Sequence, residues 1–134
     1  MLQKGLMVVV SGPAGTGKGT VIKMLRETNT NLAYSVSVTT RKPRAGEEEG
    51  INYFFRTREE FKKMIENNEL IEWVEYCDNY YGTPAGYVQE LMDSGLDVIL
   101  EIDVQGALNI ISKYPDCVSI FLLPPSFEEL KRRI

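Results

Sequence analysis

The sequence predicts an α/β fold, in which a parallel sheet flanked by helices carries an inserted, smaller β-rich lobe. Three observations support this. A short apolar run, residues 6–10, leads into a glycine-rich segment and then into a helical pattern. Strand and helix patterns alternate again near the C-terminus. Between these parts lie short aromatic strands and a hairpin pattern. We expect a single domain over residues 1–134, with a core of residues 1–38 and 95–134 and a lobe of residues 39–94.

Composition narrows the class of protein. A chain of 134 residues that is 43% hydrophobic can bury one ordinary core. The net charge of −4 argues against general nucleic-acid binding, so anion binding must depend on local clusters such as Arg41–Arg44. Cys77 and Cys117 form no short metal or redox motif, and the chain has no histidine. Without a long apolar run or a signal-like N-terminus, we expect a soluble cytoplasmic protein that does not bind membranes.

The glycine-rich segment has the P-loop spacing of Gly12, Gly17 and Lys18, and we interpret it as a mononucleotide-binding site. Glycines let the backbone wrap around phosphate, and the following helix adds its partial positive charge. Gly19 occupies the usual Ser/Thr position, so we expect the Mg²⁺ role at Thr20 or at the backbone. The alternative is a strand–helix turn without a ligand. The candidate ATP-binding residues are Gly12, Pro13, Ala14, Gly15, Thr16, Gly17, Lys18, Gly19 and Thr20.

Each element before the lobe follows from its pattern. A strand is predicted over residues 6–11, and a helix runs from about residue 18 to residue 27 before the turn-forming residues 28–31. Residues 33–38 alternate serines on one face with apolar side chains on the other, which predicts a single strand. The polar residues 39–50 are predicted to form a loop.

The lobe pattern begins with a short aromatic strand over residues 52–55. Thr57 and Glu60 form a capping box for a helix that ends near Asn67, with an apolar stripe facing the core. Residues 70–76 and 80–82 predict a hairpin with its turn at Asp78 and Asn79. Thr83 and Pro84 are then expected to begin a helix that Gly95 ends.

The C-terminal part returns to the core pattern. Residues 97–103 form a mostly apolar strand with acids at its C-terminal end, where open α/β sheets place their ligands. A helix over residues 105–113 and a buried strand over residues 117–123 follow. Ser126 and Glu129 are expected to cap a last helix whose apolar side comprises Phe127, Leu130 and Ile134. The sequence ends inside this helix.

Several segments together resemble the guanylate kinase family from the P-loop to the last residue. They are Ser37, residues 39–47, Tyr53, Glu72-Trp73, residues 80–83 and residues 101–106. The resemblance implies ATP-dependent phosphorylation of GMP to GDP with Mg²⁺ as cofactor. It also implies that relatives continue past the last helix with an arginine-bearing lid, so we expect little transfer activity from these residues alone. The oligomeric state is not predicted.

The resemblance also implies residue roles. Arginines can fork onto phosphate, and phenols can donate to it. Glu72 would accept from two adjacent guanine donors, whereas adenine has an acceptor at N1. The implied catalytic residues are Lys18, Arg41, Arg44 and Asp103, with Arg44 resembling the catalytic arginine. GMP phosphate would be held by Arg41, Arg44, Tyr53 and Tyr81, and guanine would be read by Ser37, Glu72 and Thr83 with Glu101 and Asp103 nearby.

Glu101 and Asp103 are two apart on the predicted strand and are therefore expected to share a face, with Asp103 positioning Mg²⁺. Simpler readings exist for each group. The arginine loop could be a solvated turn, Glu72 the polar side of a strand, and the two acids a solvated strand end. Other functions are a non-catalytic phosphopeptide-binding module and a kinase acting on a phosphosugar.

Overall fold

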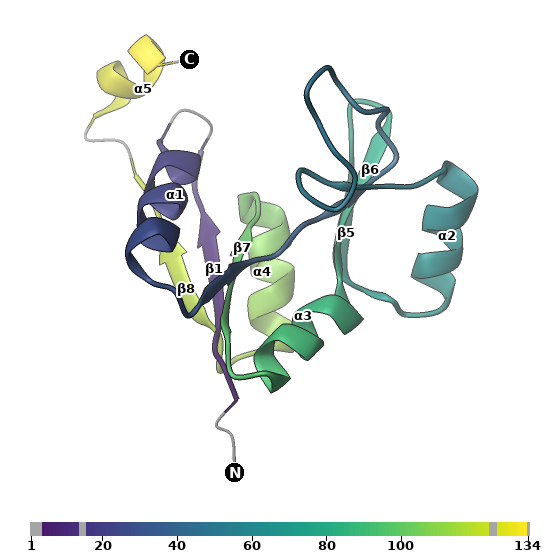
Figure 1. The fold of residues 1–134 in the computed structure, drawn as a ribbon. Helices are drawn as coiled ribbons and strands as arrows, with labels where there is room; N and C mark the ends of the chain where they lie inside the picture. The colour runs from purple at the N-terminus through teal and green to yellow at the C-terminus, as the bar shows by residue number, and fades with distance from the viewer. Residues whose placement is uncertain (1–3, 14–15, 124–125, 134) are drawn as a thin grey trace. The chain divides into compact units, whose positions relative to one another are not determined.

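The computed structural model describes residues 4–13, 16–123 and 126–133, and Figure 1 shows its elements in order. Contacts divide the chain into two compact units, residues 1–34 with 91–134 and residues 35–90. The first is called the core unit and the second the lobe unit. The sequence had placed these changes at residues 39 and 95. No helix in the described part of the chain is long and apolar enough to cross a bilayer.

The core unit contains a four-stranded sheet in the order β2-β7-β1-β8. All three strand pairs are parallel, which confirms the predicted parallel sheet. Helix α1 connects β1 to β2, and helix α4 connects β7 to β8 in the opposite direction along the sheet. Because such connections are right-handed, the two helices lie on opposite faces of the sheet. The elements are β1 Met7–Ser11, α1 Lys18–Thr28, β2 Leu32–Tyr34, β7 Asp97–Glu101, α4 Val104–Lys113, β8 Val118–Phe121 and α5 Phe127–Arg133.

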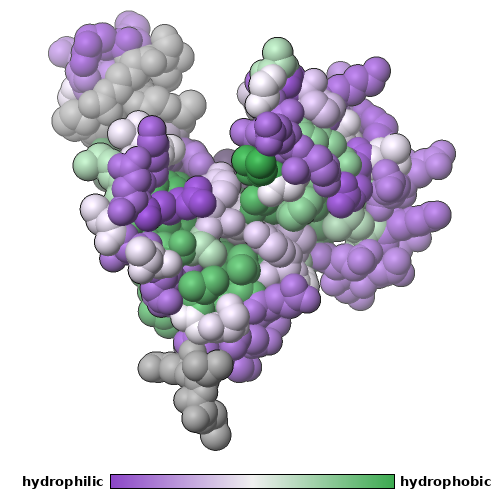
Figure 2. Space-filling view, viewed as in Figure 1, coloured by the Kyte–Doolittle hydropathy of each residue, from purple (hydrophilic) through white to green (hydrophobic). Residues whose placement is uncertain are grey.

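The two central strands carry the core. Val9, Val98 and Leu100 are at most 1% exposed, and consecutive residues of β7 are buried because helices cover both faces. Ile22 of α1 and Ile110 of α4 pack into this interior at 3% and 0% exposure. Hydrophilic side chains cover most of the face shown in Figure 2, consistent with the 25% of charged residues.

The predicted burial of residues 117–123 is wrong. Among the described residues, β8 pairs with β1 alone and forms an edge of the sheet. Its Val118, Ile120 and Phe121 are 41%, 38% and 49% exposed. An apolar run does not distinguish a central strand from an edge strand, because that depends on what lies beside it.

The predicted single strand over residues 33–38 is also wrong. The structure contains β2 and then β3, Val38–Thr39, which belongs to the other sheet. Ser35 and Val36 are both buried, so the expected alternation fails. β2 pairs with β7, whereas the Ser37 carbonyl already accepts from the Phe54 N–H at 2.8 Å. Val38 therefore belongs to the lobe unit.

The lobe unit has a second sheet in the order β4-β3-β6-β5, with β3 and β4 parallel and the other pairs antiparallel. Only Phe54 and Phe55 of the aromatic stretch form a strand. The capping box of Thr57 and Glu60 is present at the start of α2, and Phe61 in that helix is fully buried, so both predictions are confirmed. The elements are β4 Phe54–Phe55, α2 Arg58–Glu66, β5 Leu70–Tyr76 and β6 Asn79–Pro84.

The hairpin is confirmed, but its turn residues are Cys77 and Asp78, whose φ values are 51° and 65°. Such a turn suits the twist of the strands. Thr83 and Pro84 lie in β6 rather than opening a helix, because Pro84 pairs with Leu70. The next helix is α3, Ala85–Asp93.

Two predicted helix boundaries are confirmed. Gly95 has a φ of 90°, and its N–H donates to the Met92 carbonyl at 3.0 Å, as expected for a glycine stop. At the start of α5, the Ser126 hydroxyl accepts from the Glu129 N–H at 3.0 Å. The apolar side expected for this helix, Phe127, Leu130 and Ile134, lies outside the described side chains.

Candidate nucleotide-binding site

The sequence-predicted site residues fall into two sets, one in each compact unit. In the core unit, the segment between β1 and α1 depends on two glycine conformations. Gly17 is the N-cap of α1 with φ 86° and ψ 23°. Gly12 has a φ of 151°, and a Cβ there would lie 2.5 Å from the Leu122 carbonyl oxygen. A side chain is disfavoured at both positions, as the P-loop interpretation requires.

Lys18 and Thr16 fold onto the same segment. The Lys18 ammonium donates to the Gly12 carbonyl at 2.8 Å, and the Thr16 hydroxyl donates to the Pro13 carbonyl at 2.8 Å. Thr20 is exposed in the first turn of α1. Ala14 and Gly15 lie outside the described residues. The lysine charge is thus placed next to the start of a helix, where anions are stabilised.

Glu101 and Asp103 lie in different elements of the structure. β7 ends at Glu101, and Asp103 is the N-cap of α4, where its carboxylate accepts from the Gly106 N–H at 2.8 Å. The prediction that both lie on one strand is therefore wrong, because capping the following helix ends the strand earlier. The exposed Asp103 carboxylate lies at the carboxyl end of the sheet, where ligands bind in such folds.

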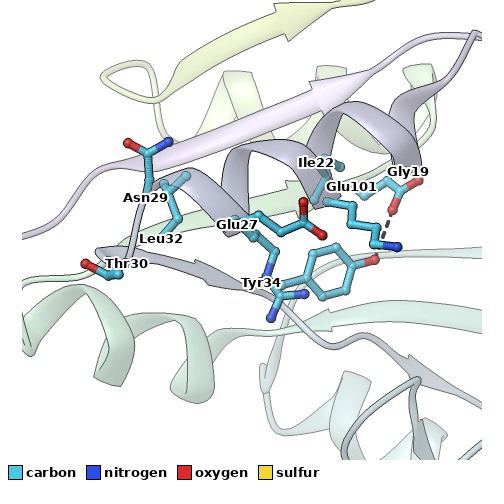
Figure 3. Close-up of a pocket in the computed structure, with 10 residues that line it drawn as sticks. Gly19, Ile22, Glu27, Asn29, Thr30, Leu32, Tyr34 and Glu101 are labelled. Atoms are coloured by element: carbon cyan, nitrogen blue, oxygen red, sulfur yellow. Dashed lines mark hydrogen bonds between the residues drawn. The ribbon is translucent and has the colours of Figure 1, made fainter.

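Glu101 has partners that the sequence reasoning missed. The Tyr34 hydroxyl donates to a Glu101 carboxylate oxygen at 3.0 Å, and the Arg26 guanidinium lies 5.3 Å from the centre of the Tyr34 ring. Figure 3 shows this pair at the wall of a pocket of about 440 Å³ between α1 and β2. The alternating pattern had placed Tyr34 on an apolar face, and nothing local linked it to an acid that follows 67 residues later.

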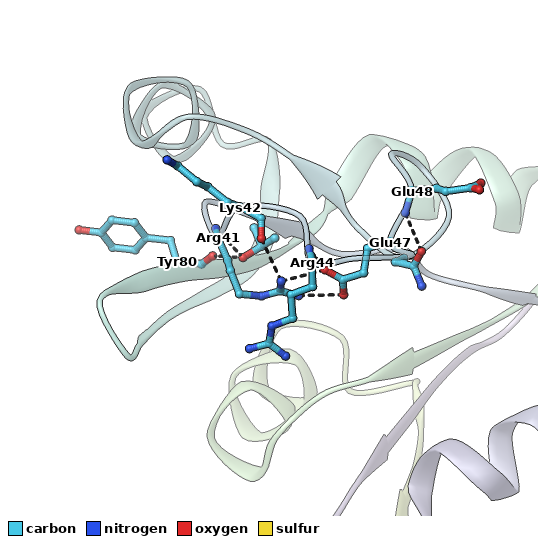
Figure 4. A network of polar contacts seen from close by, with 8 residues as sticks. Arg41, Lys42, Arg44, Glu47, Glu48 and Tyr80 are labelled. Atoms are coloured by element: carbon cyan, nitrogen blue, oxygen red, sulfur yellow. Dashed lines mark hydrogen bonds and ion pairs between the residues drawn. The ribbon is translucent and has the colours of Figure 1, made fainter.

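In the lobe unit, Arg41 lies at the centre of a polar network (Figure 4). Its two terminal nitrogens donate to the two carboxylate oxygens of Glu47 at 2.8 and 3.0 Å. The guanidinium also lies 5.2 Å from the centre of the Tyr53 ring, which contacts the Tyr81 ring edge-on at 6.2 Å. Arg41, Tyr53 and Tyr81 are therefore brought together as expected. Arg44 is exposed, and its guanidinium extends away from Glu47 in Figure 4.

This network shifts both charged groups toward their ionised forms. The hydrogen bond from Arg41 and then the backbone N–H of Arg44 lower the pKa of Glu47 to about 2. The Glu47 carboxylate raises the pKa of Arg41 above its ordinary value, burial opposes this, and the hydroxyls of Tyr81 and Tyr53 add to it. The arginine loop is a structured network rather than a fully solvated turn.

Glu72 and Thr83 meet on neighbouring strands of the lobe sheet. Glu72 is 7% exposed, Thr83 is 1% exposed, and the threonine hydroxyl donates to the Glu72 carboxylate at 2.9 Å. Its neighbour Trp73 is 42% exposed, so Glu72 is not the polar, solvent-facing residue of an alternating strand. Ser37 is half-buried just before β3. A buried carboxylate is costly unless something compensates its charge and hydrogen-bonding capacity.

The described residues contain no group of three or more His, Cys, Asp or Glu side chains able to hold a metal ion. Mg²⁺ bound with a nucleotide typically takes one or two protein ligands and completes its shell with phosphate oxygens and water. The Thr20 hydroxyl and the Asp103 carboxylate are both exposed and fit that limited demand.

The comparisons with known proteins agree with one another. The family model for guanylate kinase matches residues 4–134. A guanylate kinase of Halalkalibacterium halodurans is 61% identical over 132 residues, covering 98% of this chain and 65% of the relative. One of Bacillus subtilis is 53% identical over 135 residues, covering 100% of this chain and 66% of the relative. The crystal structure of guanylate kinase from Anaplasma phagocytophilum has a TM-score of 0.80 and 43% identity, covering 99% of this chain and 68% of that one. The chain spans about 65% of the length of the curated relatives.

Proposed function

We propose that this chain, which belongs to the guanylate kinase family, takes part in the ATP-dependent phosphorylation of GMP to GDP. One observation carries the choice of acceptor. The buried pair of Glu72 and Thr83 lies on β5 and β6 of the lobe sheet, and Arg41 lies in the loop that follows β3 of the same sheet. One unit therefore offers residues for recognising the base and residues for binding the phosphate.

The donor role belongs to the core unit. The backbone between Gly12 and Gly17 and the start of α1 would bind ATP phosphates, with Lys18 exchanging its bond to the Gly12 carbonyl for phosphate oxygens. Thr20 and Asp103 would help to hold Mg²⁺, which neutralises phosphate charge when bound. Apart from Pro13, which has no N–H, the remaining members of the segment would contribute backbone N–H groups.

The acceptor role belongs to the lobe unit. Glu101 and Asp103, which the family resemblance also assigns to the nucleotides, belong to the core unit. Arg41, Arg44 and the hydroxyls of Tyr53 and Tyr81 would bind GMP phosphate through charge-assisted bonds. Glu72 would accept from the two guanine donors, with Ser37 and Thr83 supporting recognition. These residues are Ser37, Arg41, Arg44, Tyr53, Glu72, Tyr81, Thr83, Glu101 and Asp103.

The chemistry needs no histidine. The attacking oxygen of GMP phosphate is ionised near neutral pH, so the protein must align two anions and neutralise the charge between them. Arg44 is the expected catalytic arginine because it resembles the catalytic arginine of the family. Its side chain is exposed, and its backbone N–H donates to Glu47. Its charge would stabilise the transferring phosphoryl group. The cytoplasmic location expected from the sequence stays a prediction.

Binding rather than turnover tests this proposal best, since the chain spans about 65% of its relatives' length. We would titrate the chain with GMP, AMP, UMP, ribose 5-phosphate and a phosphopeptide and follow backbone amide shifts by NMR. GMP should bind most tightly and shift signals from Arg41, Tyr81 and Glu72. Tighter binding of ribose 5-phosphate would favour a phosphosugar kinase. Binding of a phosphopeptide but no nucleotide would favour the non-catalytic module.

A further inference from the structure

The loop after β3 in the lobe unit holds an acid, Glu47, next to the two candidate phosphate-binding arginines. Glu47 forms a two-fold ion pair with Arg41, with distances of 2.8 and 3.0 Å. The two side chains are only 13% and 19% exposed, so the pair is shielded from most solvent. Ion pairs with such fork geometry and low exposure are more strongly oriented than ordinary surface pairs.

Glu47 also fixes the backbone around Arg44. The Arg44 N–H donates to the same carboxylate at 2.7 Å, and the Glu47 N–H donates back to the Arg44 carbonyl at 3.0 Å. Gly46, with a φ of 85°, lets the chain reverse between them. A single carboxylate thus holds the side chain of one arginine and the backbone of the other (Figure 4).

Counting donors shows what remains for a ligand. A guanidinium has five N–H groups. One terminal nitrogen of Arg41 donates both to Glu47 and to the Lys42 carbonyl, at 2.8 and 3.0 Å, and the other donates to Glu47 at 3.0 Å. The Nε–H and one terminal N–H remain, and together they form a fork that matches two phosphate oxygens. The hydroxyls of Tyr81 and Tyr53 raise the pKa of this guanidinium, which lies 5.2 Å from the centre of the Tyr53 ring.

We propose that Glu47 is a positioning residue for phosphate binding. Its carboxylate accepts from both terminal nitrogens of Arg41, which leaves the Nε–H and one terminal N–H for the GMP phosphate. It also accepts from the Arg44 backbone N–H and so holds that backbone in place. This inference rests on the proposed function. Because Arg41 and the Arg44 N–H lower the pKa of Glu47 to about 2, the carboxylate stays charged at neutral pH.

Two physical effects of removing the carboxylate charge oppose each other. A negative charge near the site repels phosphate, so its loss alone would tighten GMP binding. Loss of the ion pair would also free Arg41 to sample other rotamers, which weakens binding because the ligand must order it again. Weaker GMP binding after loss of the charge would therefore identify Glu47 as a positioning residue, and tighter binding would identify it only as a repelling charge.

The test compares Glu47→Gln with Glu48→Gln, a matched change at an exposed neighbour whose backbone N–H, rather than its carboxylate, donates to Asn52. Binding of GMP and of guanosine would be measured by NMR titration for each variant and the parent chain. Glu47→Gln should weaken GMP binding about tenfold and leave guanosine binding unchanged. Glu48→Gln should change neither. Glu47→Asp keeps the charge but draws the carboxylate back from the arginines, so it should also weaken GMP binding, though less than Glu47→Gln.

Other results would overturn the inference. Unchanged or tighter GMP binding by Glu47→Gln would show that Glu47 does not position the arginines. An equal loss for GMP and guanosine would indicate general damage to the lobe instead. If Glu47→Gln does not fold, parent-like GMP affinity in a folded Glu47→Asp would equally count against it. If the parent chain binds no GMP, the proposed function is overturned as well. The two Glu47→Gln results above would overturn only the role of Glu47 and not the proposed function.

Discussion

The two compact units hold their candidate phosphate-binding residues by different means. In the core unit the arrangement depends on the backbone, with Gly12 and Gly17 in conformations that disfavour side chains. In the lobe unit it depends on side chains, with Arg41 held by Glu47 and placed over the ring of Tyr53.

Because of this difference, the two units should be sensitive to different substitutions and conditions. A backbone arrangement does not titrate, but it fails when a Cβ is added where there is no room. A network of charged side chains responds to protonation and to the loss of a single partner. Four predictions test this difference between the two units.

The largest effect should follow Lys18→Ala, the one change that removes a charge from the backbone-based site. ATP binding and any GMP-dependent ADP release should fall about 10²–10³-fold while the fold remains, because Lys18 contacts the loop carbonyl rather than the core. Lys62→Ala, at an exposed position on α2, serves as the control. ATP affinity near the parent value in Lys18→Ala would remove the donor site from this segment.

Next in size should be Glu72→Gln, which tests the side-chain-based site. Replacing one acceptor by a donor should reduce the preference for GMP over AMP by about tenfold to a hundredfold. Glu75→Gln, at an exposed position on the same strand, should leave the preference unchanged. Competition binding with both nucleotides measures the ratio. An unaltered ratio in Glu72→Gln would assign base recognition to other residues.

Gly12→Ala should act on stability. The added Cβ would lie 2.5 Å from the Leu122 carbonyl at a φ of 151°, so the free energy of unfolding should fall by at least about 1–3 kcal/mol. Gly86→Ala in α3 meets nothing within 4 Å and should be neutral or stabilising. Urea denaturation of both variants measures the difference. Equal stability of the two would mean that the loop relaxes without cost.

The smallest effect at neutral pH concerns the pKa of Glu47. Because its pKa falls from 4.5 to about 2 on folding, its contribution to stability is complete above about pH 4.5 and is lost as the pH falls toward 2. In Arg41→Ala the folded pKa should rise toward 4.5, as followed by the Glu47 carboxyl carbon shift in NMR titrations. A pKa still near 2 would show that the Arg44 N–H, not Arg41, holds the carboxylate ionised.

Local signals allowed much of the fold to be predicted. The capping box of Thr57 and Glu60, the stop at Gly95 and the glycine segment between β1 and α1 all involve groups within a few residues of one another. Their physical causes are contained in short stretches of chain, so pattern alone identifies them. The GMP-binding residues, by contrast, were predicted from the resemblance to a known family and not from local pattern alone.

By itself, then, the sequence determined the α/β class, the parallel core, the hairpin and the residue types of both candidate sites. Only the tertiary structure decided that residues 33–38 divide between two sheets and that β8 is an exposed edge. It also paired Tyr34 with Glu101. These features depend on which distant segments supply hydrogen-bond partners and cover apolar faces, and a local pattern of residues carries no information about partners far along the chain.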